Sequence, residues 1–255
     1  INIYQGNWRV GGFNDKLIGG VGSGVNAGMS TSTWHHFAWT HFTKPTTSTR
    51  TMQFFINGTQ AGSDVDVSSD TFNCAGSFKI GGFHSNSGSG NWDGHIEDLR
   101  ISKGACRYPF LPRKETLATD TSFQEGVTVT ASNTKLLTAH AASITDGSAT
   151  GHSVTVSGDA AVSNFGPGGG MKSIKFDGSG DRIATAAHAD FAWGTGAFSM
   201  ECWVYLTGSQ WGHIMGHSWP AGSKESVVFV DSNRQLKWHW TDNSVVETGS
   251  NLDLN

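Results

Sequence analysis

The stretch TMQFFINGTQAGS at residues 51–63 constrains the fold of this chain more than any other segment. Two runs of β-forming residues flank the dipeptide Asn57-Gly58, and Asn-Gly tolerates the positive φ angles that both centres of a type I′ turn require. The stretch therefore predicts a β-hairpin. Nowhere in the chain do apolar residues recur convincingly at positions i, i+3, i+4 and i+7, so we expect almost no helix.

The composition favours a packed β-protein and excludes two classes of partner. Aromatic residues make up 11% of the chain and charged residues 15%, which is typical of a folded core and not of a disordered chain. The formal net charge is −4 and no run of Lys or Arg is present, so nucleic acid is not expected as a partner. No apolar stretch approaches the roughly 20 residues that span a bilayer, so membrane insertion is not expected either.

The chain divides into two blocks of strands. The first contains TWHHFAWTHF (33–42), which alternates with aromatic residues on both faces, and it closes at Pro109 and Pro112 because proline ends strands. Residues 113–133 are polar and are predicted to be a linker, and the second block runs from 134 to 255. The segment from Val228 is similar to the segment from Ile1, with an apolar pair, a polar turn and then a strand with a basic residue beside aromatics.

Both blocks resemble parts of a known domain. FDGSGDRIATA followed by AFSMECWVYL resembles the opening half of a laminin G-like domain of the concanavalin A-like class, whereas TWHHFAWT, FFINGTQAGS, FKIGGF and WDGHIEDLRISKGACRY resemble the closing half. The resemblance implies all-β, antiparallel concanavalin A-like jelly-roll sandwiches in tandem. Residues 1–112 would be the C-terminal half of one laminin G-like sandwich and 134–255 the N-terminal half of the next.

A circular permutant, in which both halves close one sandwich, is the alternative account. The repetition of the chain's ends argues against it, because residues 228–255 would duplicate residues 1–28. A half sandwich on its own would leave an apolar sheet face and long unpaired edges exposed. The chain is therefore expected to fold well only if its halves pair with each other or with neighbouring chains.

The ending EDLRISKGACRY is similar to that of laminin G-like domains in structural proteins of tailed bacteriophages. This resemblance implies a non-enzymatic structural and adhesion module of a virion, in a tail fibre, an appendage or a capsid decoration, with a virion or extracellular location. Its expected partners are a host cell-surface glycan and other virion or fibre subunits, with a homo-oligomer expected. Two alternatives stay open: a purely architectural repeat without a ligand, and a carbohydrate-binding module of a secreted bacterial adhesin or hydrolase.

The sequence does not indicate an enzyme. It contains none of the common nucleophile, zinc-protease, phosphate-loop or dinucleotide motifs. Glycoside hydrolysis needs two carboxylates that flank one bond, and the adjacent Glu97 and Asp98 would point to opposite faces of a strand. The alternating E-x-D-x-x-E strand of related glucanases is absent.

Tryptophan indicates where a sugar would bind, because sugar C–H faces pack on indole and nearby polar groups bind the hydroxyls. Loop positions are favoured over strand positions, and Trp34, Trp39 and Trp203 are expected in the core. The candidate carbohydrate-binding residues are Trp92, Trp211, His213, Trp219, Trp238 and Trp240.

Asp177 and Asp181 in DGSGD are the candidate ligands of a calcium ion, since sandwich domains of this class often hold Ca²⁺ through loop oxygens. Calcium takes about six to eight oxygen ligands, and simple Asp-Gly turn chemistry is the alternative. No other cofactor is expected. A disulfide between Cys74 and Cys106 is a further candidate, against the alternative of three reduced, buried cysteines.

Overall fold

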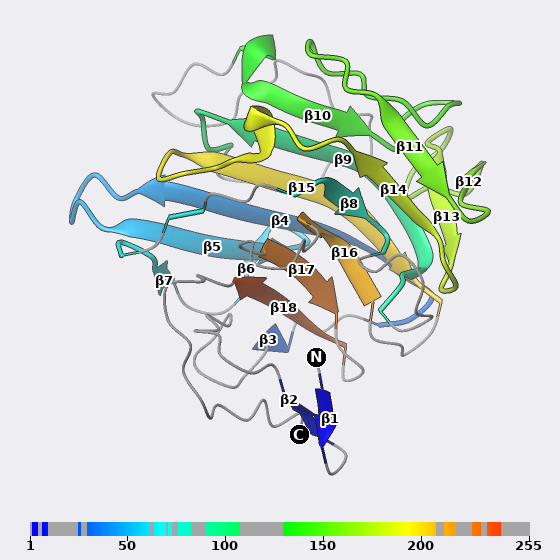
Figure 1. The fold of residues 1–255 in the computed structure, drawn as a ribbon, viewed down its shortest axis with the longest axis horizontal. Coiled ribbons are helices and arrows are strands. Elements are labelled where there is room, and N and C mark those ends of the chain that lie inside the picture. Colours follow the sequence, from blue (N-terminus) through cyan, green and yellow to red (C-terminus); the bar gives the residue numbers. More distant parts are fainter. Residues whose placement is uncertain are drawn as a thin grey trace.

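The computed structural model of the chain describes residues 2–4, 7–9, 25–26, 30–61, 64–69, 71–72, 76–82, 90–107, 130–207, 212–217, 226–230 and 234–240. These residues form an all-β, antiparallel sandwich in which two large sheets lie face to face (Figure 1). The predicted fold class, a concanavalin A-like β-sandwich, is thus confirmed. None of the described segments forms a helix of the length and apolar character needed to cross a membrane.

The first sheet has nine strands, and long strands with regular alternation form its centre. Its main order is β12-β13-β9-β15-β4-β5-β6, with β10 paired to β9 and β7 paired to β5. The strands are β4 (Trp34–Thr43), β5 (Arg50–Ile56), β6 (Thr59–Gln60), β7 (Val65–Asp66), β9 (Asp93–Lys103), β10 (Thr134–Thr138), β12 (Ala161–Ser163), β13 (Ser173–Asp177) and β15 (Phe198–Leu206).

The second sheet has seven strands in the order β11-β14-β8-β16-β17-β18-β3. They are β3 (Val25–Asn26), β8 (Phe78–Ile80), β11 (Val154–Ser157), β14 (Arg182–Thr185), β16 (Gly212–His217), β17 (Ser226–Val230) and β18 (Gln235–Trp240). Two single-turn 3₁₀ helices, η1 (Ala131–Asn133) and η2 (Ala189–Phe191), precede strands or loops of the second block.

Both sheets contain strands of the two sequence blocks, and strands of one block lie between strands of the other. In the first sheet β15 of the second block pairs with β9 and β4 of the first block, and in the second sheet β8 of the first block pairs with β14 and β16 of the second. Within this chain the two halves therefore complete one another, as in the alternative that the sequence left open. That they belong to successive domains of a tandem array, with the boundaries given above, stays a prediction.

The structure describes the predicted hairpin and the two end segments that are similar in sequence. Asn57 and Gly58 have φ angles of 50° and 80° between β5 and β6, which confirms the hairpin. The two similar end segments also both form antiparallel strand pairs: β17 with β18 inside the second sheet, and β1 (Asn2–Tyr4) with β2 (Asn7–Arg9) as a separate two-stranded sheet.

The core lies between the two sheets, where alternate residues of each strand meet. Phe54 of β5 stacks on Trp39 of β4 with ring centroids 5.8 Å apart, and Phe198 of β15 meets Trp39 edge to face at 5.3 Å. Ile80 and Val228 join the same buried cluster from the second sheet. The prediction that Trp39 is a core residue is confirmed.

Candidate aromatic binding site

Four strands bring one side chain each into a row across the outer face of the nine-stranded sheet. Tyr205 of β15 is in register with Trp34 of β4 on one side and with His95 of β9 on the other. His95 is in turn in register with Lys175 of β13. Since Val204 and Leu206 belong to the core, alternation directs Tyr205 to the opposite face.

A fourth ring covers this row. Phe165, in the loop between β12 and β13, lies 5.4 Å from Trp34, 4.8 Å from Tyr205 and 5.1 Å from His95, measured between ring centroids. Trp34 and Tyr205 are 5.4 Å apart and both are half-buried. Phe165 is 42% exposed, although it is large and apolar. We call Trp34, Phe165, Tyr205 and His95 the aromatic cluster.

Hydrogen bonds hold the loop and the ring of His95 in place. The hydroxyl of Ser173 donates to the carbonyl of Phe165 at 2.6 Å. Because that hydroxyl has only one proton, His95 Nδ1, 2.9 Å from the same oxygen, is the donor of the second contact. Burial, and then the positive charge of Lys175, lower the pKa of His95, while Asp93 acts in the opposite direction. His95 is therefore a neutral imidazole at neutral pH, with Nδ1 protonated.

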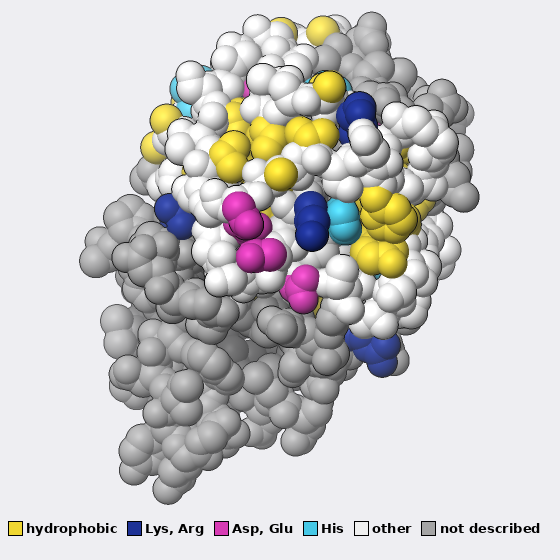
Figure 2. All heavy atoms as spheres, turned by 90° about the vertical axis from the view of Figure 1, so that its right-hand side faces the viewer, with side chains coloured by type: hydrophobic (Ala, Val, Ile, Leu, Met, Phe, Trp, Pro, Cys, Tyr) yellow, Lys and Arg dark blue, Asp and Glu magenta, His cyan; other side chains and the backbone are white. Residues whose placement is uncertain are grey.

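Charged groups border the cluster on one side. Lys175 is exposed next to His95, and Asp177 pairs in register with Asp93 at the ends of β13 and β9. Figure 2 shows this face of the molecule, with hydrophobic side chains beside a histidine, a basic side chain next to the histidine, and acidic side chains beyond it. The surface thus offers flat apolar rings beside hydrogen-bonding and charged groups.

Asp177, which borders the cluster, belongs to the predicted calcium pair. Asp177 and Asp181 come together with a third residue, Asp159, so that one carboxylate oxygen of each lies within 4.8 Å of the others. The two oxygens of Asp181 accept the backbone N–H groups of Asp159 and Asp177 at 2.8 and 2.9 Å. Asp159 was missed in the sequence because it lies 18 residues before Asp177 and shares no motif with it. Calcium binding itself stays a prediction.

Two predicted sugar-binding residues lie inside the protein. Trp92, directly before β9, is only 2% exposed and belongs to the core. His213 of β16 is 5% exposed, and its Nδ1 lies 2.6 Å from the carbonyl oxygen of Gly90. The expectation that Trp92 and His213 form an exposed sugar-binding surface is wrong in this structure.

The other predicted tryptophans give no test of the site. Trp211 and Trp219 lie outside the described residues, and for Trp238 and Trp240 only the backbone of β18 is described. Trp34, in contrast, was expected in the core and instead lies half-buried on the outer face. The alternation in residues 33–42 and 197–208 showed two distinct faces, but only the strand register reveals that Trp34 and Tyr205 meet.

The cysteines carry no disulfide among the described residues. Cys106 and Cys202 are both buried, free thiols in the structure, whereas Cys74, the predicted partner of Cys106, lies outside the described residues. Burial raises the pKa of Cys106 to about 12, which keeps the thiol protonated and unreactive.

Comparison with known proteins agrees with the fold and with part of the resemblance. A laminin G family model described as the concanavalin A-like lectin/glucanases superfamily matches residues 5–107, less than half of the chain. Neither the curated proteins nor the solved structures yielded a match. The match covers the first block, which contributes Trp34 and His95 to the aromatic cluster; Phe165 and Tyr205 come from the second block.

Proposed function

We propose that this β-sandwich is a non-enzymatic carbohydrate-binding module whose sugar site is the aromatic cluster. The observation that carries the proposal is the exposed Phe165 ring set against Trp34 and Tyr205, next to His95 and Lys175. Sugar C–H faces pack on such rings, and the imidazole and ammonium groups are placed to bind hydroxyl or acidic substituents. The similarity of residues 5–107 to the lectin/glucanase superfamily supports the same class of ligand.

We further propose that the module serves adhesion in a virion, in a tail fibre, appendage or capsid decoration, where it binds a glycan of the host surface. The support for this narrower role is the resemblance of EDLRISKGACRY to the domain endings of tailed-phage structural proteins. A purely architectural repeat is the second candidate. In that case Phe165 and its neighbours would be covered by another subunit, because an exposed aromatic cluster also suits a protein interface.

The test is binding of the chain to an array of neutral and acidic oligosaccharides. The double variant F165A/Y205A is expected to lose at least about tenfold in affinity, equivalent to about 1.4 kcal/mol, because it removes the exposed stacking surface. V156A is the matched control: Val156 is also exposed, at 40%, but it lies on β11 of the other sheet.

Sedimentation velocity on the same variants separates the two candidates. If F165A/Y205A loses glycan binding and keeps the oligomeric state, the cluster is a sugar site. If the variant dissociates an oligomer while the parent chain binds no glycan, the architectural role replaces the proposal. Glycan binding that survives in F165A/Y205A would place the sugar elsewhere on the surface.

A further inference from the structure

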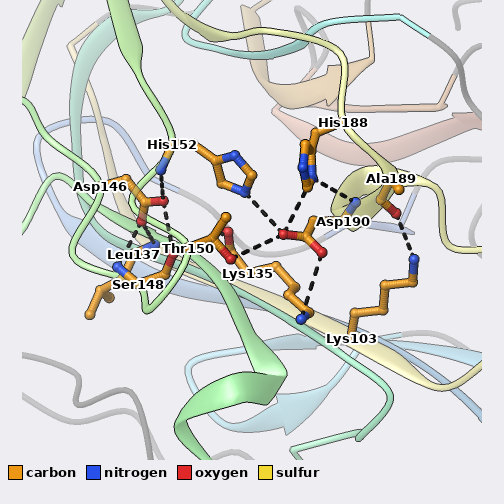
Figure 3. A network of polar contacts seen from close by, with 10 residues as sticks. All are labelled: Lys103, Lys135, Leu137, Asp146, Ser148, Thr150, His152, His188, Ala189 and Asp190. Carbon is orange, nitrogen blue, oxygen red and sulfur yellow. Dashed lines mark hydrogen bonds and ion pairs between the residues drawn. The ribbon is translucent and has the colours of Figure 1, made fainter.

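A second cluster of polar side chains surrounds the carboxylate of Asp190, at η2. Its Oδ2 lies 3.2 Å from Nε2 of His152 and 3.4 Å from Nδ1 of His188. The hydroxyl of Thr150 donates to the same oxygen at 3.2 Å. Figure 3 shows the two imidazoles converging on Asp190 from different segments, with Lys135 reaching it from β10.

We propose that His152, His188 and Asp190 form a binding site for a divalent transition-metal ion, with Zn²⁺ the best-suited ion. Two imidazole nitrogens and one carboxylate oxygen are a donor set that zinc takes in proteins. The ligand atoms of the three residues all lie within 4.8 Å of one another. This site was missed in the sequence, because His152 lies 36 residues before His188 and shares no motif with His188 and Asp190.

The spacing of the donor atoms suits tetrahedral zinc. With Zn–N and Zn–O bonds of about 2.0–2.1 Å at tetrahedral angles, neighbouring ligand atoms are about 3.3–3.4 Å apart. The contacts of Asp190 Oδ2 with the two imidazoles, 3.2 and 3.4 Å, match this value. The imidazole rings of His152 and His188 are also close, with centroids 4.7 Å apart. Two of the three contacts between ligand atoms thus already have the spacing that zinc requires.

The surroundings orient the carboxylate of Asp190. Lys135 Nζ lies 3.6 Å from Oδ1, the oxygen that does not face the histidines. Oδ2 is thus left on the side of the two imidazoles, where a metal would bind.

The hydrogen bonding of His188 also suits its role as a metal ligand. Its Nδ1 accepts the backbone N–H of Asp190 at 3.1 Å, as the cap of η2, so this nitrogen carries a lone pair and no proton. Metal binding through Nδ1 would exchange this hydrogen bond for a metal bond. The side chain of His188 is 48% exposed, so water has access to complete the coordination.

The site differs in chemistry from the acidic group of Asp159, Asp177 and Asp181. Three carboxylates suit hard ions such as Ca²⁺, whereas imidazole ligands favour zinc and similar transition metals. Excess Ca²⁺ in the buffer is therefore expected to occupy the acidic group without blocking the histidine site. The proposal is also independent of carbohydrate binding, because it shares no residue with the aromatic cluster.

The experiment is titration of the chain with Zn²⁺ alone, by calorimetry in buffer with excess Ca²⁺, with visible absorption of bound Co²⁺ as a second measurement. We expect one ion per chain and a tetrahedral Co²⁺ spectrum. H188N keeps an acceptor that suits a helix cap while it removes the imidazole, and D190N removes the carboxylate charge. Both variants are expected to bind zinc at least about tenfold more weakly.

H140N is the matched control, because it removes an imidazole that is not part of the site. Thermal unfolding of each variant without metal shows whether it is folded. Unchanged zinc affinity and stoichiometry in folded H188N, or no zinc binding by the parent chain, would overturn the proposal. Weakened binding in H188N and D190N but not in H140N supports it.

Discussion

Arg100 and Glu201 form a buried ion pair that joins the two halves of the chain. Arg100 Nε and Nη2 lie 2.9 and 2.5 Å from Oε1 of Glu201, across the pairing of β9 with β15. His36 Nε2 of β4 lies 3.4 Å from the other carboxylate oxygen. The pair therefore spans three neighbouring strands, and its partners come from different sequence blocks.

Removal of one partner is expected to destabilise the protein strongly. E201M leaves the charge of Arg100 buried without its carboxylate, which costs about 3–5 kcal/mol in the free energy of unfolding. The double variant R100M/E201M replaces both charges with apolar groups of similar length and is expected to recover most of this loss. Urea denaturation of both variants measures the two values. If E201M is as stable as the parent chain, the two strands do not pair as described.

The same pair predicts a loss of stability in acid. Burial acts to raise the pKa of Glu201, but the charge of Arg100 and the hydrogen bond from His36 lower it from 4.5 to about 2. A depressed pKa contributes stability that is complete above about pH 4.5 and is lost as the pH falls towards 2. Urea midpoints between pH 6 and 3 are expected to fall more steeply for the parent chain than for R100M/E201M. Parallel curves would contradict the assignment.

Glu97 predicts the opposite dependence above pH 4.5. Its side chain is fully buried and neither carboxyl oxygen has a hydrogen-bond partner. Burial, with a smaller contribution from Asp98, raises the pKa of Glu97 from 4.5 to about 9. The folded state thus keeps a proton that the unfolded state releases, so this contribution to stability falls as the pH rises from about 4.5 to 9.

E97Q imitates the protonated carboxyl and removes this dependence. At pH 8 the variant is expected to be about 4–5 kcal/mol more stable than the parent chain, since the folded parent chain has to hold a proton that the unfolded chain releases at about pH 4.5. At pH 4 the two proteins are expected to have similar stability. Urea denaturation at both pH values checks this, and equal stability at pH 8 would mean that Glu97 is not buried as the structure has it.

Gly94 lies closely against the backbone of Tyr205. It has a φ angle of 145°, and a Cβ atom placed on it would lie 1.9 Å from the carbonyl oxygen of Tyr205. G94A is therefore expected to push β15 away from β9, to destabilise the fold by about 1–3 kcal/mol and to weaken glycan binding at the aromatic cluster. G169A, where nothing lies within 4 Å of the added atom, is the control and is expected to change neither property.

Calcium is expected to stabilise the chain through Asp159, Asp177 and Asp181. A ligand that binds only the folded state raises the melting temperature with its concentration. The rise on addition of Ca²⁺ is expected to disappear on addition of a chelator and in the variant D159N/D177N. A melting temperature that does not respond to Ca²⁺ would leave these residues as turn-forming groups only.

Much of the fold could be predicted from the sequence, because the signals are local. The two-residue period of residues 33–42, the turn at Asn57-Gly58 and the lack of helical period all act within one element, where side-chain direction and backbone angles decide the outcome. The division into two blocks was also apparent from composition and from the prolines. The side-chain direction within a strand, the turn geometry and the fold class were thus determined by the sequence alone.

The tertiary structure decided which strands are neighbours, and with them the sites. β15 lies between β9 and β4, so Tyr205 meets Trp34 and His95, residues that stand far apart in the chain. The same register buries Glu201 against Arg100, while the packing of loops brings His152, His188 and Asp190 together. Strand pairing depends on contacts between distant segments, and a shift of one residue would exchange the two faces of a strand. No local pattern carries that information.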